Sequence, residues 1–174
     1  MQKIKKFHVD LTKNTEVPFF QVPSELRIRF GVELFENGNL HLLKDIINNT
    51  LHRSEQMDVT FLSGYMINDR RYREKTNIGK YIKIKNWSET IVYRDEINAN
   101  VIFASIQDVR FKEVYPYIKS IVKGMNSPFI VFYQDSYLVY VSEDVIDIIS
   151  NDRHLIQNLK NQYQEVFDTY YENR

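Results

Sequence analysis

The chain has 174 residues, of which 43% are hydrophobic and 14% aromatic, and its 23 basic residues balance 23 acidic ones. This length suits one domain that buries its own core. The absence of cysteine excludes disulfides, a thiolate nucleophile and a cysteine-ligated zinc, and it favours the cytoplasm. Balanced charge argues against a dedicated nucleic-acid binder. No apolar run is long enough for a signal peptide or a membrane span.

The first 25 residues mix polar side chains with two prolines and the pair Phe19-Phe20, which predicts a segment packed on the core. We expect residues 26–174 to form one domain. Residues 26–32 alternate apolar with polar side chains over their first positions, as in a half-buried strand. This pattern predicts that Arg27 and Arg29 face water.

The middle of the chain predicts a helix followed by strands. Residues 40–51 carry an apolar stripe of Leu40, Leu43, Ile47 and Leu51, which is typical of an amphipathic helix. Residues 57–67 and 78–85 are interpreted as strands, joined by a protruding polar connection over residues 68–75. Lysines alternate along the second run, which suggests an exposed edge. Residues 87–95 show no clear pattern.

A buried strand is expected over residues 100–106, followed by a helical stripe of Val114, Ile118, Ile121, Val122 and Met125. Pro116 falls inside this stripe. Because proline fits best in the first turn of a helix, we expect the helix to begin near Tyr115 and to end at Gly124.

The C-terminal third gives the clearest pattern. Residues 128–133 and 137–142 predict a hairpin at the centre of a sheet, because their apolar residues do not alternate with polar ones. Residues 145–149 predict a third strand, and residues 150–152 supply N-cap side chains. A helix of about five turns should follow, with a stripe of Leu155, Leu159, Tyr163, Val166, Phe167 and Tyr170. The fold class expected is α+β, a mostly antiparallel mixed sheet with about three helices.

Residues with catalytic or ligand chemistry are few and scattered. The histidines, His8, His41, His52 and His154, lack metal-ligand spacing, and the five glycines form no phosphate-binding loop. We therefore expect no metal, no cofactor and no enzyme activity. Asp144, Asp147 and Asp152 could together hold a cation or act as acid and base, although capping and turn roles are favoured.

Charge is distributed unevenly along the chain. Residues 69–85 contain seven basic and two acidic residues, together with Tyr72 and Tyr81, whereas residues 134–172 contain eight acidic and two basic ones. The basic run could contact phosphates and stack on bases. The acidic end could bind a basic protein, and both could be ordinary solvated faces.

Four features resemble a family of small, mainly bacterial proteins known as domain of unknown function 3885: residues 26–31, the hairpin over 129–141, the run over 146–149, and Asp152 followed by Leu159, Tyr163 and Tyr170. The resemblance covers most of the chain after residue 25. Ser142-Glu143-Asp144-Val145 stands where the family has Asp-Asp-Arg-Gly, and Val166 stands in place of its last tryptophan. Relatives look like proteins encoded beside bacterial toxins, which implies an immunity role.

The leading hypothesis is a non-catalytic immunity protein that binds a cognate toxin, expected to be a nuclease, in the cytoplasm. Its predicted contact residues are Tyr140, Glu143, Asp144, Asp147 and Tyr170. One alternative is a nucleic-acid-binding accessory protein that uses Arg70, Arg71, Tyr72, Arg73 and Tyr81. Another is an enzyme with an acidic site at Asp144, Asp147 and Asp152. The sequence does not indicate the oligomeric state.

Overall fold

The computed structural model describes residues 2–12, 16–36, 38–51 and 56–172. These residues form one eight-stranded antiparallel sheet in the order β1-β8-β7-β6-β2-β5-β4, with β3 paired to β2 beside this path. The strands are β1 (Arg27–Gly31), β2 (Met57–Ile67), β3 (Arg70–Arg73), β4 (Ser88–Arg94), β5 (Ala99–Val109), β6 (Ile130–Tyr133), β7 (Leu138–Val141) and β8 (Val145–Ile149). The helices are α1 (Leu40–Thr50), α2 (Phe111–Val122) and α3 (Arg153–Gln162). The α+β class is confirmed.

The predicted hairpin forms the centre of the sheet. β6 and β7 pair in antiparallel register from Ile130 with Val141 to Tyr133 with Leu138, and every residue of both strands is buried. β8 adds to β7, as expected from the run over residues 145–149. A strand with no polar face must be covered on both sides, and both faces of the sheet are covered at β6 and β7.

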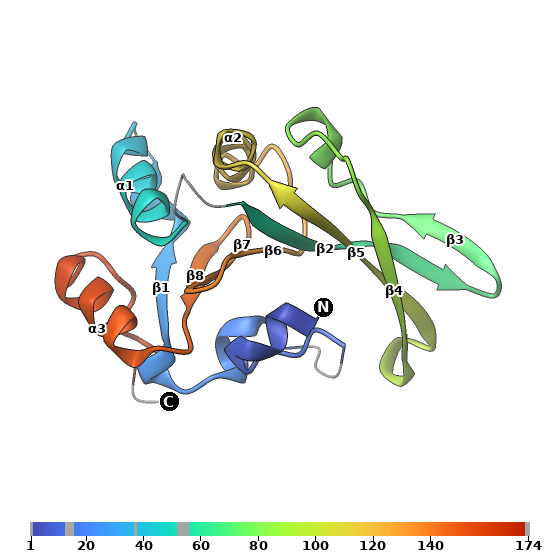
Figure 1. Ribbon diagram of the computed structural model, residues 1–174, viewed down its shortest axis with the longest axis horizontal. Helices are drawn as coiled ribbons and strands as arrows, with labels where there is room; N and C mark the ends of the chain where they lie inside the picture. The colour runs from blue at the N-terminus through green and yellow to red at the C-terminus, as the bar shows by residue number, and fades with distance from the viewer. Residues whose placement is uncertain (1, 13–15, 37, 52–55, 173–174) are drawn as a thin grey trace.

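The two faces of the sheet have different covers. α1 and α2 lie on one face and α3 lies beside the β1 edge, while the N-terminal segment lies on the opposite side (Figure 1). The helical face buries Ile28, Phe61 and Phe132 with residues of all three helices. The other face buries Val131 and Leu138 with the N-terminal segment.

The N-terminal segment consists largely of the short 3-10 helices Gln2–Phe7, Pro18–Gln21 and Ser24–Leu26. It buries Ile4, Phe7, Val9, Leu11 and Val22 against the sheet. The segment that was expected to lie on the core therefore has these apolar side chains packed against the sheet.

The expected exposure of the β1 arginines is wrong. Arg27 and Arg29 are only 3% and 7% exposed. Their guanidinium carbons lie 4.1 and 4.0 Å from the centre of the Phe19 ring, and Arg29 also bonds to Asp147 of β8. The alternation does describe two faces of a strand, but the N-terminal segment covers the face that was expected to meet water.

The region between β2 and β5 also differs from the prediction. Residues 78–85 are not a strand, because Ile78–Lys80 form a 3-10 helix and no strand follows until Ser88. Ile78 and Ile82 are buried four residues apart, which is the spacing of a helical turn. The polar connection contains β3, and the ambiguous stretch over residues 87–95 contains β4.

Two helix boundaries were misplaced. α2 begins at Phe111 with Pro116 inside it, because Glu113 accepts hydrogen bonds from the backbone N–H of Arg110 and of Lys83 and so fixes an earlier start. Gly124 ends this helix as predicted: its φ is +67°, and its N–H donates to the Ile121 carbonyl.

α3 is shorter than predicted, since it ends at Gln162. Residues 163–172 turn back to β1, where the Asp168 N–H donates to the Arg29 carbonyl. Tyr163 stays buried against Phe30, but Val166, Phe167 and Tyr170 do not continue a helix. None of the helices in the described ranges is long and apolar enough to cross a membrane.

Candidate functional site: an exposed outer arm

The acidic and aromatic residues predicted to bind a partner do not form one surface. Asp147 is completely buried and Tyr140 is 7% exposed, so their predicted surface position is wrong. Glu143 and Asp144 are exposed in the turn between β7 and β8. Tyr170 is 67% exposed, in the C-terminal segment. Of the five predicted residues, only Glu143, Asp144 and Tyr170 could contact a partner directly.

Asp147 is used inside the protein. Its Oδ1 and Oδ2 atoms accept hydrogen bonds from Nε and Nη2 of Arg29 at 2.6 and 2.9 Å. Burial raises the pKa of Asp147 to about 6, against the opposing effect of the hydrogen bonds and charge of Arg29. Burial and the nearby Asp147 charge also raise the pKa of Tyr140 to about 12. This ion pair joins β1 to β8.

The three aspartates of the alternative enzyme hypothesis have separate roles. Asp152 caps α3, where its carboxylate accepts the His154 N–H at 2.8 Å, and Asp144 lies in the exposed turn. Among the residues that the structure describes, no group of three or more histidine or acidic side chains could hold a metal ion. His52 lies outside the described residues.

The basic residues of the nucleic-acid hypothesis are better placed. Arg70, Arg71, Tyr72 and Arg73 are all exposed on β3. Tyr81 differs, because its half-buried ring packs 5.2 Å from the buried ring of Tyr117. The expectation that Tyr81 joins an open stacking surface is therefore wrong.

Residues 67–97, called the outer arm below, hold most of the exposed large apolar side chains. They comprise the end of β2, all of β3 and β4, and the segment between those two strands. In the described chain they contribute seven of ten such side chains: Ile67, Tyr72, Ile84, Trp87, Ile91, Tyr93 and Ile97. β3 and β4 lie at the opposite end of the molecule from α1 and α3 (Figure 1). Apolar surface gathered in this way marks an interaction site.

A cleft of about 420 Å³ lies between the outer arm and the core. Phe61 lies at its inner side, and the Trp87 ring packs edge-on against Phe61 with 5.5 Å between ring centres. Glu89 accepts a hydrogen bond from Trp87 Nε1 at 3.1 Å and pairs with Arg71. Hydrogen bonding from Arg71 holds the pKa of Glu89 below its usual value. Arg73, Glu74 and Ile84 complete much of the lining, which therefore combines apolar and charged groups.

A close backbone approach positions β3. Gly64 of β2 pairs with Arg73 of β3, and a Cβ atom on Gly64 would lie 2.1 Å from the Tyr72 carbonyl oxygen. Its φ of +157° is also rare for residues with a side chain. Only glycine lets β3 lie against β2 in this way. The Glu74 N–H then donates to the Ser63 carbonyl and fixes the chain where it leaves β3.

β4 closes the sheet path and was missed by the sequence analysis. It pairs with β5 over seven consecutive residues, from Ser88 with Ser105 to Arg94 with Ala99. Glu89, Ile91 and Tyr93 are exposed, while Thr90 and Val92 between them are half-buried. This alternation is weak in the sequence because apolar residues occupy both faces. A period of two over residues 89–93 was the available signal.

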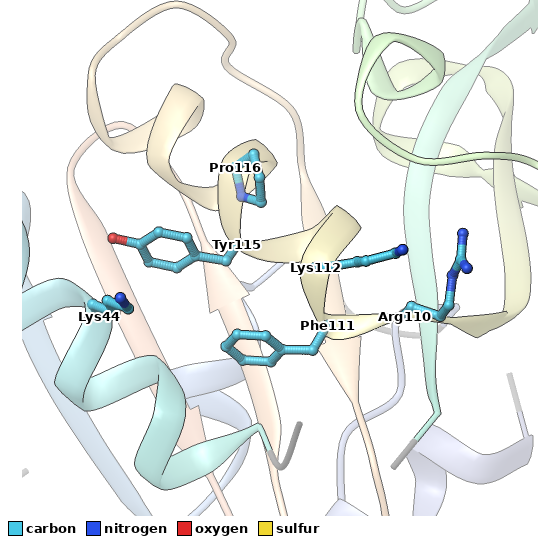
Figure 2. A pocket seen from close by; sticks show the side chains of 6 residues that line it. All are labelled: Lys44, Arg110, Phe111, Lys112, Tyr115 and Pro116. Carbon is cyan, nitrogen blue, oxygen red and sulfur yellow. The ribbon is translucent and has the colours of Figure 1, made fainter. Parts of the chain in front are cut away.

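A second hollow, of about 610 Å³, lies between α1 and α2. Figure 2 shows the rings of Phe111 and Tyr115 pointing from α2 towards the side of Lys44, whereas Lys112 and Arg110 point away. The two rings are stacked at 6.5 Å. The residues that line it include no carboxylate or histidine that could transfer a proton at neutral pH.

No family model matches the chain, and no curated protein or solved structure matches it either. The resemblance to domain of unknown function 3885 therefore remains a prediction. The outer arm carries tryptophan, tyrosine and arginine beside aliphatic side chains, which is the composition typical of protein-binding surfaces.

Proposed function

We propose that the protein is a non-catalytic binding protein that holds a partner protein in the cleft of the outer arm. The observation that carries this proposal is the concentration of exposed large apolar side chains on residues 67–97. Trp87 is 45% exposed at the cleft, and its ring is already oriented by Phe61 and Glu89. A preoriented aromatic ring loses little conformational entropy when a partner covers it.

The charge of the arm indicates what such a partner offers. The outer arm carries eight basic and five acidic residues, and seven of the basic ones lie within residues 69–85, so an acidic rim around an apolar centre would complement that stretch. Arg71 is already paired with Glu89, while Arg73 is exposed beside it. A partner carboxylate near Arg73 would gain an ion pair without displacing Glu89.

We propose further that the partner is a bacterial toxin, which the protein neutralises in the cytoplasm. This part rests on the resemblance in residues 26–31, 129–141 and 146–149 and on Asp152 with the tyrosines that follow it. An immunity protein needs shape and charge complementarity but no catalytic group. The contact surface proposed is the outer arm, because the acidic residues that suggested a basic partner are divided among the interior, an exposed turn and a helix cap.

The test is to express the tagged protein with the products of the adjacent genes of its native operon. We expect one of them to co-purify in equal amount, to be lethal when expressed alone and to be harmless in the complex. If none of the adjacent products binds or is toxic, the immunity role is wrong.

Nucleic acid is a second candidate partner, favoured by the exposure of Arg70, Arg71, Tyr72 and Arg73. Four of the seven exposed apolar side chains on the arm are isoleucines, which neither stack on bases nor bind phosphate, so a protein partner fits better. Retardation of single-stranded RNA or DNA that weakens steeply as salt rises would favour the second candidate.

A further inference from the structure

We propose that the free edge of β4 pairs with β4 of a second copy of this chain, in antiparallel register centred on Ile91. The resulting homodimer would have one continuous sheet. This inference concerns the edge of β4 and does not depend on the identity of the partner proposed for the cleft.

β4 is an edge strand that lacks the usual protection. It is the last strand in the sheet order, and among the described residues only β5 pairs with it. Natural edge strands are protected from pairing by charged side chains, above all lysine, or by proline, a bulge or short length. β4 contains no lysine and no proline, its charged residues Glu89 and Arg94 leave residues 90–93 uncharged, and its pairing with β5 has no register shift. β3, the other strand beside the main path, is shorter and carries three arginines among its four residues.

The exposed face of β4 is self-complementary. In an antiparallel pair centred on Ile91, Ile91 faces its own copy and Glu89 faces Tyr93 of the second copy. On the opposite face, Thr90 meets Val92 of the second copy. Cross-strand pairs of β-branched and aromatic residues stabilise a sheet. Ile91 and Tyr93 are 53% and 54% exposed, so the pairing would cover apolar surface that the single chain leaves in water.

Charge does not oppose this pairing. The charged residues of β4 are Glu89 and Arg94, and in the proposed register they face Tyr93 and Ser88. No two like charges therefore lie opposite each other. The formal net charge of the whole chain is zero, so two copies do not repel each other through their total charge.

The proposed symmetry also determines on which face of the sheet the cleft of each copy opens. A two-fold axis perpendicular to an antiparallel sheet leaves each face on the same side in both copies. Glu89 lies at the cleft, so the two clefts would open on one face of the continuous sheet. Such a dimer would offer two binding sites to partners on that face.

Sedimentation velocity of the full-length protein tests the dimer. Measured from about 1 to about 100 µM, the wild-type protein should shift from monomer towards dimer as concentration rises. Ile91→Lys and Ile91→Glu each place two like charges on the two-fold axis, and each should raise the dissociation constant of the dimer about tenfold or more. Ile97→Lys is the matched control, because Ile97 is also 53% exposed but lies in the turn after β4.

Mixing the two charged variants tests the register. Ile91→Lys and Ile91→Glu together place opposite charges on the axis, so the mixture should form a heterodimer while each variant alone remains a monomer. Far-ultraviolet circular dichroism checks that both variants are folded. A wild-type protein that is monomeric at every concentration would overturn the proposal. So would an Ile91→Lys dimer as strong as that of Ile97→Lys, or a mixture that fails to associate.

Discussion

β7 and β4 contain similar side chains and have opposite surroundings. β7 has the sequence Leu-Val-Tyr-Val and is wholly buried, whereas β4 contains the run Thr-Ile-Val-Tyr and exposes about half of Ile91 and of Tyr93. The difference comes from position, because β7 lies at the centre of the sheet with both faces covered and β4 lies at its edge. The apolar content of a strand therefore does not by itself show what covers it, and the outer arm stands apart from the body of the protein.

The largest effect should come from the buried ion pair in the body. Asp147→Leu leaves the Arg29 guanidinium buried without its carboxylate and should lower the free energy of unfolding by about 3–5 kcal/mol. The double variant Arg29→Met with Asp147→Leu removes both charges and should recover much of this loss. Urea unfolding of both single variants and the double variant measures the coupling. Additive losses would show that the two side chains act independently.

The same pair should give the body a characteristic pH dependence. The pKa of Asp147 is raised by burial from 3.8 to about 6, so the folded protein binds the proton more tightly than the unfolded chain. The proton-linked part of this carboxyl's contribution to stability is therefore complete below about pH 4 and is lost as pH rises through about 6. Because Asp147→Asn resembles the protonated carboxyl and does not titrate, the unfolding free energy of the wild type should rise relative to that of Asp147→Asn as pH falls from 7 to 4. Parallel pH profiles would contradict this assignment.

Matched isoleucines in the body and the arm sharpen the comparison. Ile148 of β8 is fully buried, and Ile148→Ala should cost about 2–5 kcal/mol because it leaves a cavity. Ile91→Ala on β4 should cost less than about 1 kcal/mol, since half of its side chain already meets water. Urea unfolding at protein concentrations below the dissociation constant of the proposed dimer measures both losses of unfolding free energy. Equal losses would mean that β4 is buried by the chain itself.

Gly64→Ala should loosen the arm selectively. The added methyl group would meet the Tyr72 carbonyl, and overpacking of this kind costs about 1–3 kcal/mol. We expect faster amide hydrogen exchange over residues 70–73 and unchanged exchange in β6 and β7. Gly79→Ala is the control, because nothing lies within 4 Å of a Cβ atom there. Unchanged exchange in β3 would show that the strand adapts to the methyl group.

The sequence was most informative where one physical rule decides the structure. The hairpin of β6 and β7 was predictable because apolar residues on both faces require a central strand. Arg27 and Arg29 were predicted to face water because alternation of apolar and polar residues shows which side chains share a face of the strand. It does not show which other segments of the chain pack on each face. Phe19, in the N-terminal segment, and Asp147, which is 118 residues from Arg29 in the sequence, surround these two arginine side chains.

The candidate site was only partly predictable. Lysine and arginine density identified the basic side of the outer arm, including Arg71 and Arg73. The cleft was missed, because Trp87 and Glu89, which line it, fall in a stretch where apolar residues occupy both faces of a strand. Asp147 was assigned to a surface on its charge, while its burial depends on the pairing of β8 with β1.

The most direct test compares the outer arm with the surface predicted from the sequence. The partner protein recovered in the co-purification experiment proposed above is titrated against two folded variants, Trp87→Ala in the cleft and Tyr170→Ala in the C-terminal segment. Calorimetry should show that Trp87→Ala weakens binding by about 30-fold or more, as is usual for a central aromatic contact, and that Tyr170→Ala leaves it unchanged. The reverse result would place the partner on the C-terminal segment and contradict the proposed role of the outer arm.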